Sequence, residues 1–590
     1  MQDASNKLDL LHDEDYDVPF NPQNLNHAGM VFSRNRKRWS LDGSWTFTID
    51  RFDTGLRQHW YRDCHLPIEG RISPWDYDVH NGETIEVPSC WNFARPEYFH
   101  YEGSVWFGRQ FAYDQGSDCE RIMLRIGAAH YDTKVFLNGK FLGNHYGGST
   151  PFFVELTEHL LEDNWLFLCV NNERSLDRVP MRHCDWFNYG GVFREVDLLP
   201  LPEVFIKDCF VRLGHDDQPG SIEAGVTLSD AIDGESVLVI PELRIDVRVP
   251  IRRGAGAITL EASPDLWSPE NPRLYDVVVS FGVDSIREKI GFRRITIDGQ
   301  KILLNDEVIK LKGICAHEDD RDRGRVTDEE DIRRRFHHAK ELGANFMRLA
   351  HYPHHERAAE IADEVGLLLW EEIPVYWSIA FDKEATFKDA DNQLRELIGR
   401  DRNRASVIAW GVGNENADTD DRLNFMRRLA ETARSLDSSR LIAAACLVNQ
   451  SAKKIEDRLT AHLDLVGINE YYGWYEPDID DLIEIGRNYD LDRPLIITET
   501  GADAPAGRQS NRNELFSEDQ MLACYEAQFE TIAGIDAIKG FCPWILYDFR
   551  TERRKNSFQH GYNRKGLIDA DKETKKLAFD ALRRFYHETW

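Results

Sequence analysis

The sequence contains no CxxC motif and no local cluster of cysteine with histidine, although it has 10 cysteines. They are spread along the chain, at positions 64, 90, 119, 169, 184, 209, 315, 446, 524 and 542. This distribution excludes a zinc-ribbon or thioredoxin-type motif. Most of the cysteines fall inside apolar, strand-like runs, and we therefore predict buried, reduced thiols.

Long hydrophobic runs are also missing. No stretch of 18 apolar residues occurs, so the sequence predicts no membrane span. The first 20 residues, MQDASNKLDLLHDEDYDVPF, are acidic and lack the basic start and apolar core of a signal peptide. We expect a cytoplasmic protein, or a periplasmic or secreted one whose leader has been removed.

Positive charge is in deficit. The 72 Lys and Arg face 102 Asp and Glu, which gives a formal net charge of −30. Such a chain repels nucleic acid and anionic membranes, so we expect neither as a partner. An acidic ligand would have to be held by a local group of cations.

What the chain does contain is ordinary globular material, with 42% hydrophobic and 29% charged residues. A length of 590 residues is too great for one core and predicts several domains. The 15 Trp, 20 Tyr and 31 Phe suit both the binding of sugar faces and the cores of β-sandwiches.

The pattern of apolar residues divides the chain into four parts. Residues 1–30 form a polar N-terminal extension, and residues 31–200 show short alternating runs broken by Gly, Pro and Asn. Within them, VFLNGKFLG (135–143) places Asn-Gly between apolar pairs, a strong hairpin signal. Residues 201–295 continue the strand pattern at a length that suits an immunoglobulin-like β-sandwich. The sequence therefore predicts two β-sandwiches before a different last part, residues 296–590.

That last part alternates apolar strand-like runs with helical patterns such as DEEDIRRRFHHAKELG and EDQMLACYEAQFETIAG. Strands buried on both faces should be continuously apolar, as these are. Eight such units indicate a (β/α)8 TIM barrel. The predicted strands are 309–316, 344–350, 367–375, 407–412, 440–446, 464–469, 494–500 and 538–547.

The chemistry of such a barrel lies at the carboxyl ends of its strands. The fourth strand runs through IAWGVGNENAD (408–418) into Asn414 and Glu415, and the seventh ends in Glu499. Two carboxyls across a bowl of aromatic residues suit glycoside hydrolysis, in which one donates a proton and the other attacks the anomeric carbon. Asn414 could hydrogen-bond the neighbouring sugar hydroxyl, and the glycines could let backbone and sugar approach closely. For Glu371 and Glu372 we favour surface salt bridges.

The chain resembles glycoside hydrolase family two over residues 37 to 590. The motifs that carry the resemblance are LDGSWTF, VFLNGKFLGNHYGGSTPF, WFNYGGVFREV, LKGICAHEDD, ANFMRLAHYPH, RDRNRASVIAWGVGNE, GINEYYGWY and PLIITETGAD. The resemblance implies a jelly-roll sandwich, an immunoglobulin-like sandwich and a TIM barrel, in that order. It also implies a retaining mechanism with Glu415 as acid/base and Glu499 as nucleophile, their carboxyls about 5–5.5 Å apart. No cofactor is implied, and a dimer or tetramer would be typical of the family.

Within the family the chain is most similar to β-glucuronidases. GINEYYGWY is similar to a segment that lines the sugar pocket, which implies pocket roles for Asn469, Tyr471 and Tyr475. CDWFNYGG is similar to a first-domain loop that reaches the same pocket and implicates Asp185, although a structural turn is the alternative. His351 and Trp544 also match pocket positions.

The segment GYNRKGL (561–567) resembles the Asn-x-Lys of glucuronidases, whose side chains hold the substrate carboxylate. Asn563 and Lys565 match it, and the alternative for Lys565 is a surface lysine capping the last loop. The chain departs from the glucuronidase pattern at Thr500, where an aromatic is usual, and at Gln559, where several have arginine. Four further cations follow the eighth strand in DFRTERRKN (548–556): Arg550, Arg553, Arg554 and Lys555. We expect at least two of these four to be solvated loop residues.

Three functions follow as hypotheses. The first is an exo-acting β-glucuronidase, and the second is a β-galactosidase or β-galacturonidase of the same family. The third is a non-catalytic carbohydrate-binding protein, against which the pair of glutamates argues. His317 with three following carboxylates is a weak ligand set, and we predict that no metal is required.

Overall fold

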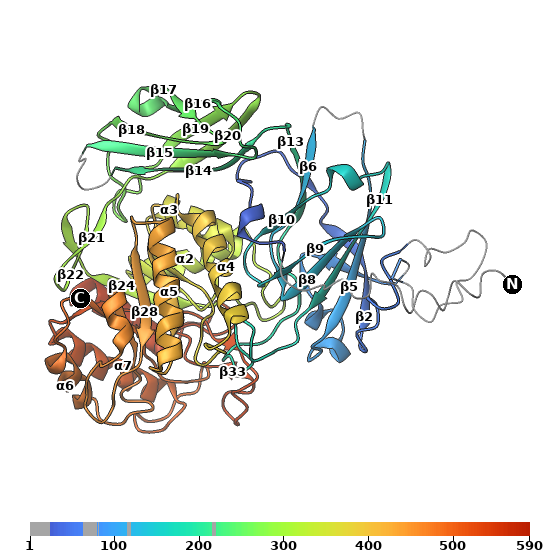
Figure 1. The fold of residues 1–590 in the computed structure, drawn as a ribbon. Coiled ribbons are helices and arrows are strands. Elements are labelled where there is room, and N and C mark those ends of the chain that lie inside the picture. Colours follow the sequence, from blue (N-terminus) through green and yellow to red (C-terminus); the bar gives the residue numbers. More distant parts are fainter. Residues whose placement is uncertain (1–23, 63–78, 81, 115–119, 215–219) are drawn as a thin grey trace.

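A computed structural model describes residues 24–62, 79–80, 82–114, 120–214 and 220–590. In Figure 1 two β-rich domains, blue to teal and green, flank a barrel that runs from yellow to red. The eight cysteines within the described residues are buried free thiols. Cys64, Cys119 and the first 23 residues of the predicted N-terminal extension lie outside the described residues.

The first domain is built from antiparallel sheets that enclose an apolar core around Trp45, Phe107 and Leu168. The predicted hairpin is confirmed, because Leu137 pairs with Lys140 and both turn residues, Asn138 and Gly139, have positive φ. A six-stranded sheet has the order β3 (Glu83–Val87), β2 (Gly43–Asp50), β5 (Ser104–Ala112), β11 (Asp163–Asn171), β8 (Asp132–Leu137), β9 (Lys140–Tyr146). A four-stranded sheet has the order β1 (Trp39–Ser40), β13 (Val196–Leu201), β6 (Arg121–Ile126), β10 (Phe152–Glu155), and a small one joins β4 (Ser89–Cys90), β12 (Gly191–Val192), β7 (Ala129–His130).

The second domain is a sandwich of two antiparallel sheets whose buried faces meet around Leu238, Val249 and Tyr275. Alternate residues of its strands face this core, as in β20 (Asp284–Ile290), where every second side chain is buried. One sheet has the order β14 (Ile206–Leu213), β15 (Ser221–Leu228), β18 (Ala255–Glu261). The other has the order β17 (Ile245–Ile251), β16 (Gly234–Ile240), β19 (Tyr275–Phe281), β20 (Asp284–Ile290).

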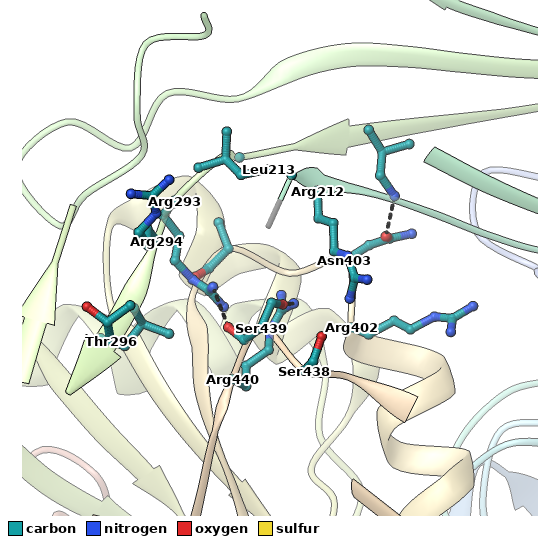
Figure 2. A pocket seen from close by; sticks show the side chains of 15 residues that line it. Arg212, Leu213, Arg293, Arg294, Thr296, Arg402, Asn403, Ser438, Ser439 and Arg440 are labelled. Carbon is teal, nitrogen blue, oxygen red and sulfur yellow. Dashed lines mark hydrogen bonds between the residues drawn. The ribbon is translucent and has the colours of Figure 1, made fainter. Parts of the chain in front are cut away.

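Hydrogen bonds hold the second domain against the base of the barrel (Figure 2). Arg293 donates from Nε to the carbonyl of Ala405 at 3.0 Å and from Nη1 to the carbonyl of Ser439 at 3.1 Å. The side chain of Asn403 accepts from the backbone N–H of Val211 at 3.1 Å. Buried carbonyls at the strand starts are thereby satisfied by another domain, which fixes the end of the barrel opposite its carboxyl edge.

The eight predicted strands close into a parallel barrel in chain order, which confirms the TIM-barrel prediction. A small antiparallel sheet precedes it, formed by β21 (Ile295–Asp298), β22 (Lys301–Leu304) and β23 (Glu307–Ile309). The barrel strands are β24 (Leu311–Ala316), β25 (Phe346–Leu349), β26 (Leu368–Glu372), β27 (Val407–Asn414), β28 (Leu441–Cys446), β29 (Leu465–Asn469), β30 (Leu495–Glu499) and β31 (Ile538–Phe541). Nearly all their side chains are buried, because the barrel interior covers one face and helices the other.

Helices follow most of the barrel strands and cover them outside. The first starts at a capping box, in which the Asp328 side chain accepts from the backbone N–H of Asp331 at 2.9 Å. The helices are α2 (Glu329–Glu341), α3 (Glu356–Val365), α4 (Glu384–Asp401), α5 (Asp420–Leu436), α6 (Asp480–Asn488), α7 (Glu518–Ala533) and α8 (Leu577–Glu588). The fifth unit differs from the predicted strand–helix pattern, because its connection holds only the 3₁₀ helix η8 (Arg458–His462). Among the described residues, no helix combines the length and the apolar character needed to cross a membrane.

Candidate active site

A cavity of about 600 Å³ opens at the carboxyl edge of the barrel strands. Its size is that of a small-molecule pocket. Both predicted catalytic glutamates line it, together with six of the predicted binding residues. The lining includes Asp185, His351, Tyr376, Trp377, Glu415, Asn469, Tyr471, Tyr475, Glu499, Trp544, Arg553, Arg554 and Gln559.

Glu499 ends β30 and is held by two donors. Arg348 Nη1 donates to Oε1 at 2.9 Å, and the Tyr471 hydroxyl donates to Oε2 at 2.7 Å. The pKa of Glu499 is raised to about 8: burial raises it most, Arg348 acts against this shift, and the nearby charge of Glu415 adds to it. The two glutamates are therefore close enough to interact electrostatically, and both donors favour the ionised form of Glu499.

Arg348, at the end of β25, connects the site residues of several strands. Its fully buried guanidinium contacts both oxygens of Glu372, at 3.0 Å each, and donates to Asn414 Oδ1 at 2.7 Å. His351 Nδ1 also lies 2.7 Å from Glu372. Glu372 does form an ion pair, but the prediction that it lies at the surface is wrong. Its carboxylate is buried and supports the site.

Glu371 is buried as well, and it points away from this network towards Arg400, at 3.8 Å. Burial and the neighbouring Asp401 raise its pKa well above the usual range. The prediction of a surface location for Glu371 is also wrong, because a residue after a barrel strand can face the helix layer as well as the solvent.

Glu415 follows directly on β27 and is held by two other donors. Trp377 Nε1 donates to Oε2 at 2.6 Å, and Asn469 Nδ2 donates to Oε1 at 3.0 Å. Its backbone is left-handed, with φ of 51°, a conformation that L residues keep only where the surroundings impose it. Each glutamate is therefore oriented by its own pair of donors.

Two features of β27 bear on the expected sugar contacts. The Asn414 Nδ2 is buried and has no hydrogen-bond partner among the described residues, and Asn414 itself is not among the residues that line the cavity. The glycines serve packing within the protein instead, since a Cβ at Gly411 would lie 2.4 Å from Trp370 Nε1. Close packing within the protein therefore explains Gly411, without an approach of the backbone to the sugar.

The first domain contributes one wall of the cavity through the segment between β11 and β12. Asp185 accepts from the Thr551 hydroxyl at 3.0 Å and from Arg554 Nη2 at 2.6 Å. The next residue, Trp186, packs against His351 with 5.7 Å between ring centroids. A segment of one domain thus lies against the catalytic edge of another.

Aromatic and polar side chains complete the wall. Trp544 stacks on His351, with ring centroids 4.8 Å apart and an interplanar angle of 21°. The Tyr475 hydroxyl accepts from Arg554 Nη1 at 2.8 Å, and the Tyr475 ring lies 5.3 Å from that of Tyr471. These surfaces give the cavity apolar faces with polar groups at defined points, as sugar binding requires.

The predicted carboxylate clamp lies behind this wall. Lys565 is 1% exposed and is paired with the buried carboxylate of Asp503, and its Nζ also donates to the Tyr475 hydroxyl at 3.0 Å. Asn563 is buried in β33 (Tyr562–Asn563) and accepts from the backbone N–H of Lys565 at 3.1 Å. Neither residue lines the cavity. The alternative of an exposed surface lysine is wrong, because Lys565 is buried.

The four cations after the eighth strand divide into two pairs. Arg553 and Arg554 line the cavity, whereas Arg550 and Lys555 line a separate surface pocket. Sequence reasoning missed Trp377, which belongs to a connecting loop and reaches Glu415 only because of how that loop folds.

The carboxylates near His317 are engaged with protein groups. Glu318 pairs with Arg194 at 2.9 Å, and Asp320 pairs with Lys572 at 2.7 Å. His317 itself contacts the Tyr352 hydroxyl at 3.0 Å. Within the part of the chain that the structure describes, no group of three His, Cys, Asp or Glu side chains is arranged to hold a metal ion.

Comparison with known proteins finds relatives over nearly the whole chain. A β-glucuronidase of Paenibacillus borealis is 26% identical over 612 residues, covering 93% of this chain and 97% of the relative. The solved β-glucuronidase of an uncultured Clostridium sp. has a TM-score of 0.82 at 27% identity, covering 95% of this chain and 99% of that one. The β-glucuronidase of Ruminococcus gnavus in complex with D-glucuronic acid has a TM-score of 0.83 at 25% identity, covering 95% and 100%.

Family models match all three domains. The sugar binding domain of glycosyl hydrolases family 2 matches residues 39–202, a second family 2 model matches 204–293, and the family 2 TIM barrel domain matches 295–588. The chain therefore belongs to glycoside hydrolase family 2 and is a glycoside hydrolase.

Proposed function

We propose that the chain is a retaining, exo-acting β-glycosidase that removes terminal β-D-glucuronic acid from glycans or conjugates. The observation that carries the proposal is the pair of glutamates, Glu415 and Glu499, each fixed by its own donors at one cavity. A retaining mechanism needs one carboxyl as acid/base and the other as nucleophile.

The first step breaks the glycosidic bond. Glu415 gives its proton to the glycosidic oxygen, while ionised Glu499 attacks the anomeric carbon and forms a glycosyl ester. The leaving group departs as an alcohol. Arg348 and Tyr471 hold Glu499 in place for this attack, and Asn414 Nδ2 can donate to the 2-hydroxyl as positive charge develops on the sugar.

The second step hydrolyses the ester. Glu415, now ionised, takes a proton from water, and the resulting hydroxide attacks the anomeric carbon and releases Glu499. The sugar leaves with its original β-configuration, and both carboxyls return to their starting states.

The electrostatics of Glu499 bear on its proposed role as nucleophile. Its pKa is raised to about 8, mainly by burial, and Arg348 and the Tyr471 hydroxyl act against that shift. Glu499 must be ionised to attack, and these two donors favour its ionised form.

Two observations support a uronate as the sugar. Relatives over nearly the full length are β-glucuronidases, and one of them was solved with D-glucuronic acid. Arg554 also lines the cavity, and its Nε is buried without a partner among the described residues. We place the substrate carboxylate at Arg554 and Tyr475, and Lys565 with Asn563 would join them if the ammonium turned away from Asp503.

A β-galactosidase, or a β-galacturonidase, is the second candidate. The ion pair of Lys565 with Asp503 favours a neutral sugar, since the carboxylate of Asp503 already neutralises the ammonium. A galacturonidase would keep the carboxylate contact and differ at one hydroxyl.

The test is hydrolysis of a panel of 4-nitrophenyl β-glycosides: glucuronide, galacturonide, galactoside and glucoside. We expect the glucuronide to be hydrolysed fastest, with β-glucuronic acid as the first product in NMR spectra. A 2-fluoro glucuronide should label the peptide that contains Glu499, and Glu499→Gln should lose about 10³-fold or more in kcat/KM. Galactoside hydrolysis in preference to the glucuronide would establish the second candidate, and α-product first would exclude retention.

A further inference from the structure

We propose that Arg553, together with Trp377, forms a leaving-group subsite that takes an anionic oxygen group, a carboxylate or a sulfate. The natural substrate would then carry an acidic group on the side of the bond that departs. The inference rests on the proposed function in one respect, the role of Glu415 as proton donor.

The position of Arg553 relative to Glu415 defines the subsite. A proton donor must touch the glycosidic oxygen, so the groups that surround it on the outer side face the leaving group. Trp377 contacts the proposed proton donor, since its Nε1 donates to Glu415 Oε2 at 2.6 Å, and the proposal assigns it to that outer side. The Arg553 guanidinium carbon lies 4.7 Å from the centroid of the Trp377 ring, and both residues line the cavity.

Trp377 is a fixed platform. Its backbone N–H donates to the carbonyl of Asn414 at 2.9 Å, and its carbonyl accepts from Asn416 Nδ2 at 2.7 Å. The Tyr376 ring packs against it with centroids 4.5 Å apart. A guanidinium resting on this ring is therefore held at a defined place beside the acid, by an attraction between cation and indole.

Arg553 differs from the other two cations of the site in its charge balance. Arg554 is paired with Asp185, and Lys565 is paired with Asp503. Arg553 has no acidic partner among the described residues, and its side chain makes one hydrogen bond, from Nη1 to the carbonyl of His183 at 3.3 Å. An arginine has five donors, so the greater part of its capacity is available to a ligand.

The chemistry of the guanidinium selects the ligand class. Its planar fork binds the two oxygens of a carboxylate or sulfate side by side. The net charge of −30 offers such a group no general attraction. An unpaired arginine beside the acid/base is thus a local counter-charge for an anion that would otherwise be repelled.

The experiment compares leaving groups on one sugar. Aryl glucuronides with a neutral, a carboxylate-bearing and a sulfate-bearing phenol, matched in phenol acidity, are tested with wild type, Arg553→Met and Arg553→Lys. Lys555→Met is the matched control, because Lys555 is a neighbouring exposed cation that lines the separate surface pocket. Each kcat/KM is measured at low and at high ionic strength.

We expect Arg553→Met to lower kcat/KM about 10-fold for the anionic leaving groups and less than about 3-fold for the neutral one. Arg553→Lys should fall in between, because an ammonium keeps the charge but not the fork. The preference should weaken in high salt, and Lys555→Met should leave the ratio unchanged. The better of the two anionic substrates identifies the group as carboxylate or sulfate.

Equal losses for neutral and anionic leaving groups would overturn the proposal, because Arg553 would then only support Trp377. No loss with any substrate would overturn it too. If wild type hydrolyses no glucuronide, it is the proposed function that fails, and the same leaving groups are then tested on the sugar that the enzyme accepts.

Discussion

Replacing Lys565 with methionine tests the charge pair behind the cavity wall. The Lys565 and Asp503 side chains are each 1% exposed. Without the ammonium, the donors that remain to the Asp503 carboxylate among the described residues are neutral: Gln559 Nε2 at 2.9 Å and the backbone N–H of Arg564 at 2.8 Å. Breaking a buried pair by removing one partner costs about 3–5 kcal/mol, so the free energy of unfolding should fall by that amount.

The loss of stability in Lys565→Met should depend on pH, because it involves the charge of Asp503. Burial raises the pKa of Asp503, but Lys565 and then Arg554 outweigh burial, and the pKa lies below its usual value. A carboxyl with a lowered pKa stabilises the fold above its unfolded pKa of about 3.9 and loses that contribution as the pH falls. Without Lys565, burial is no longer outweighed to the same extent and the pKa of Asp503 rises above its wild-type value. Lys565→Met should therefore be much less stable than wild type at pH 7, and the difference should shrink towards pH 4 as the carboxyl of the variant takes up a proton.

The assay is urea unfolding followed by tryptophan fluorescence, alongside kcat/KM for 4-nitrophenyl glucuronide. The double variant Asp503→Asn with Lys565→Met removes both charges and should recover most of the lost stability. If its activity recovers as well, Lys565 acts through the fold. If its activity stays about 10²-fold low on a stable protein, Lys565 contacts the substrate. A single variant within about 1 kcal/mol of wild type would refute the reasoning.

Four further predictions concern the reaction. The kcat/KM should rise as the pH rises towards about 8, because Glu499 must be ionised to attack and its pKa is raised to about 8; a profile that stays flat over this range would contradict this. Tyr471→Phe removes a donor 2.7 Å from Glu499, a charge-assisted bond worth about 1.5–3 kcal/mol. Its kcat/KM should drop about 10- to 100-fold and the rise of activity with pH should move to higher pH, because Tyr471 lowers the pKa of Glu499; unchanged kinetics would count against a role of this bond. Trp377→Phe keeps a ring but removes the donor to Glu415 at 2.6 Å, so kcat should fall about 10-fold, more for poor leaving groups than for nitrophenol; an equal loss with both would argue against positioning of the acid. EDTA should leave activity unchanged, because the described residues offer no three-ligand metal group, and activity lost to the chelator and restored by Mg²⁺ would overturn that.

The barrel could be predicted because each of its strands leaves a recognisable pattern in a short stretch of sequence. Strands such as β27 are buried on both faces and therefore read as continuous apolar runs, and their carboxyl ends must meet at one edge. That rule alone placed Glu415 and Glu499 together. The fifth connection was harder, because η8 is too short to show a helical period in the sequence.

The partners of the site residues could not be predicted, since they come from distant parts of the chain. Asp503 meets Lys565 across 62 positions, and no local pattern shows that a Gly-Ala-Asp soon after Glu499 will neutralise a lysine of the last loop. Trp377 reaches Glu415 from a connecting loop and with a positive φ that its residue type disfavours. Loop geometry of this kind is set by tertiary packing and leaves no period in the sequence.

The contact between Asp185 and Arg554 joins residues 369 positions apart. During synthesis the first domain can fold early, since domains form as units from the N-terminus. Asp185 can form its hydrogen bond to Arg554 only after the barrel strands and the loop that follows β31 have been made. A chain that stops before residue 554 lacks this contact, so the wall that Asp185 and Arg554 form together is completed late in synthesis.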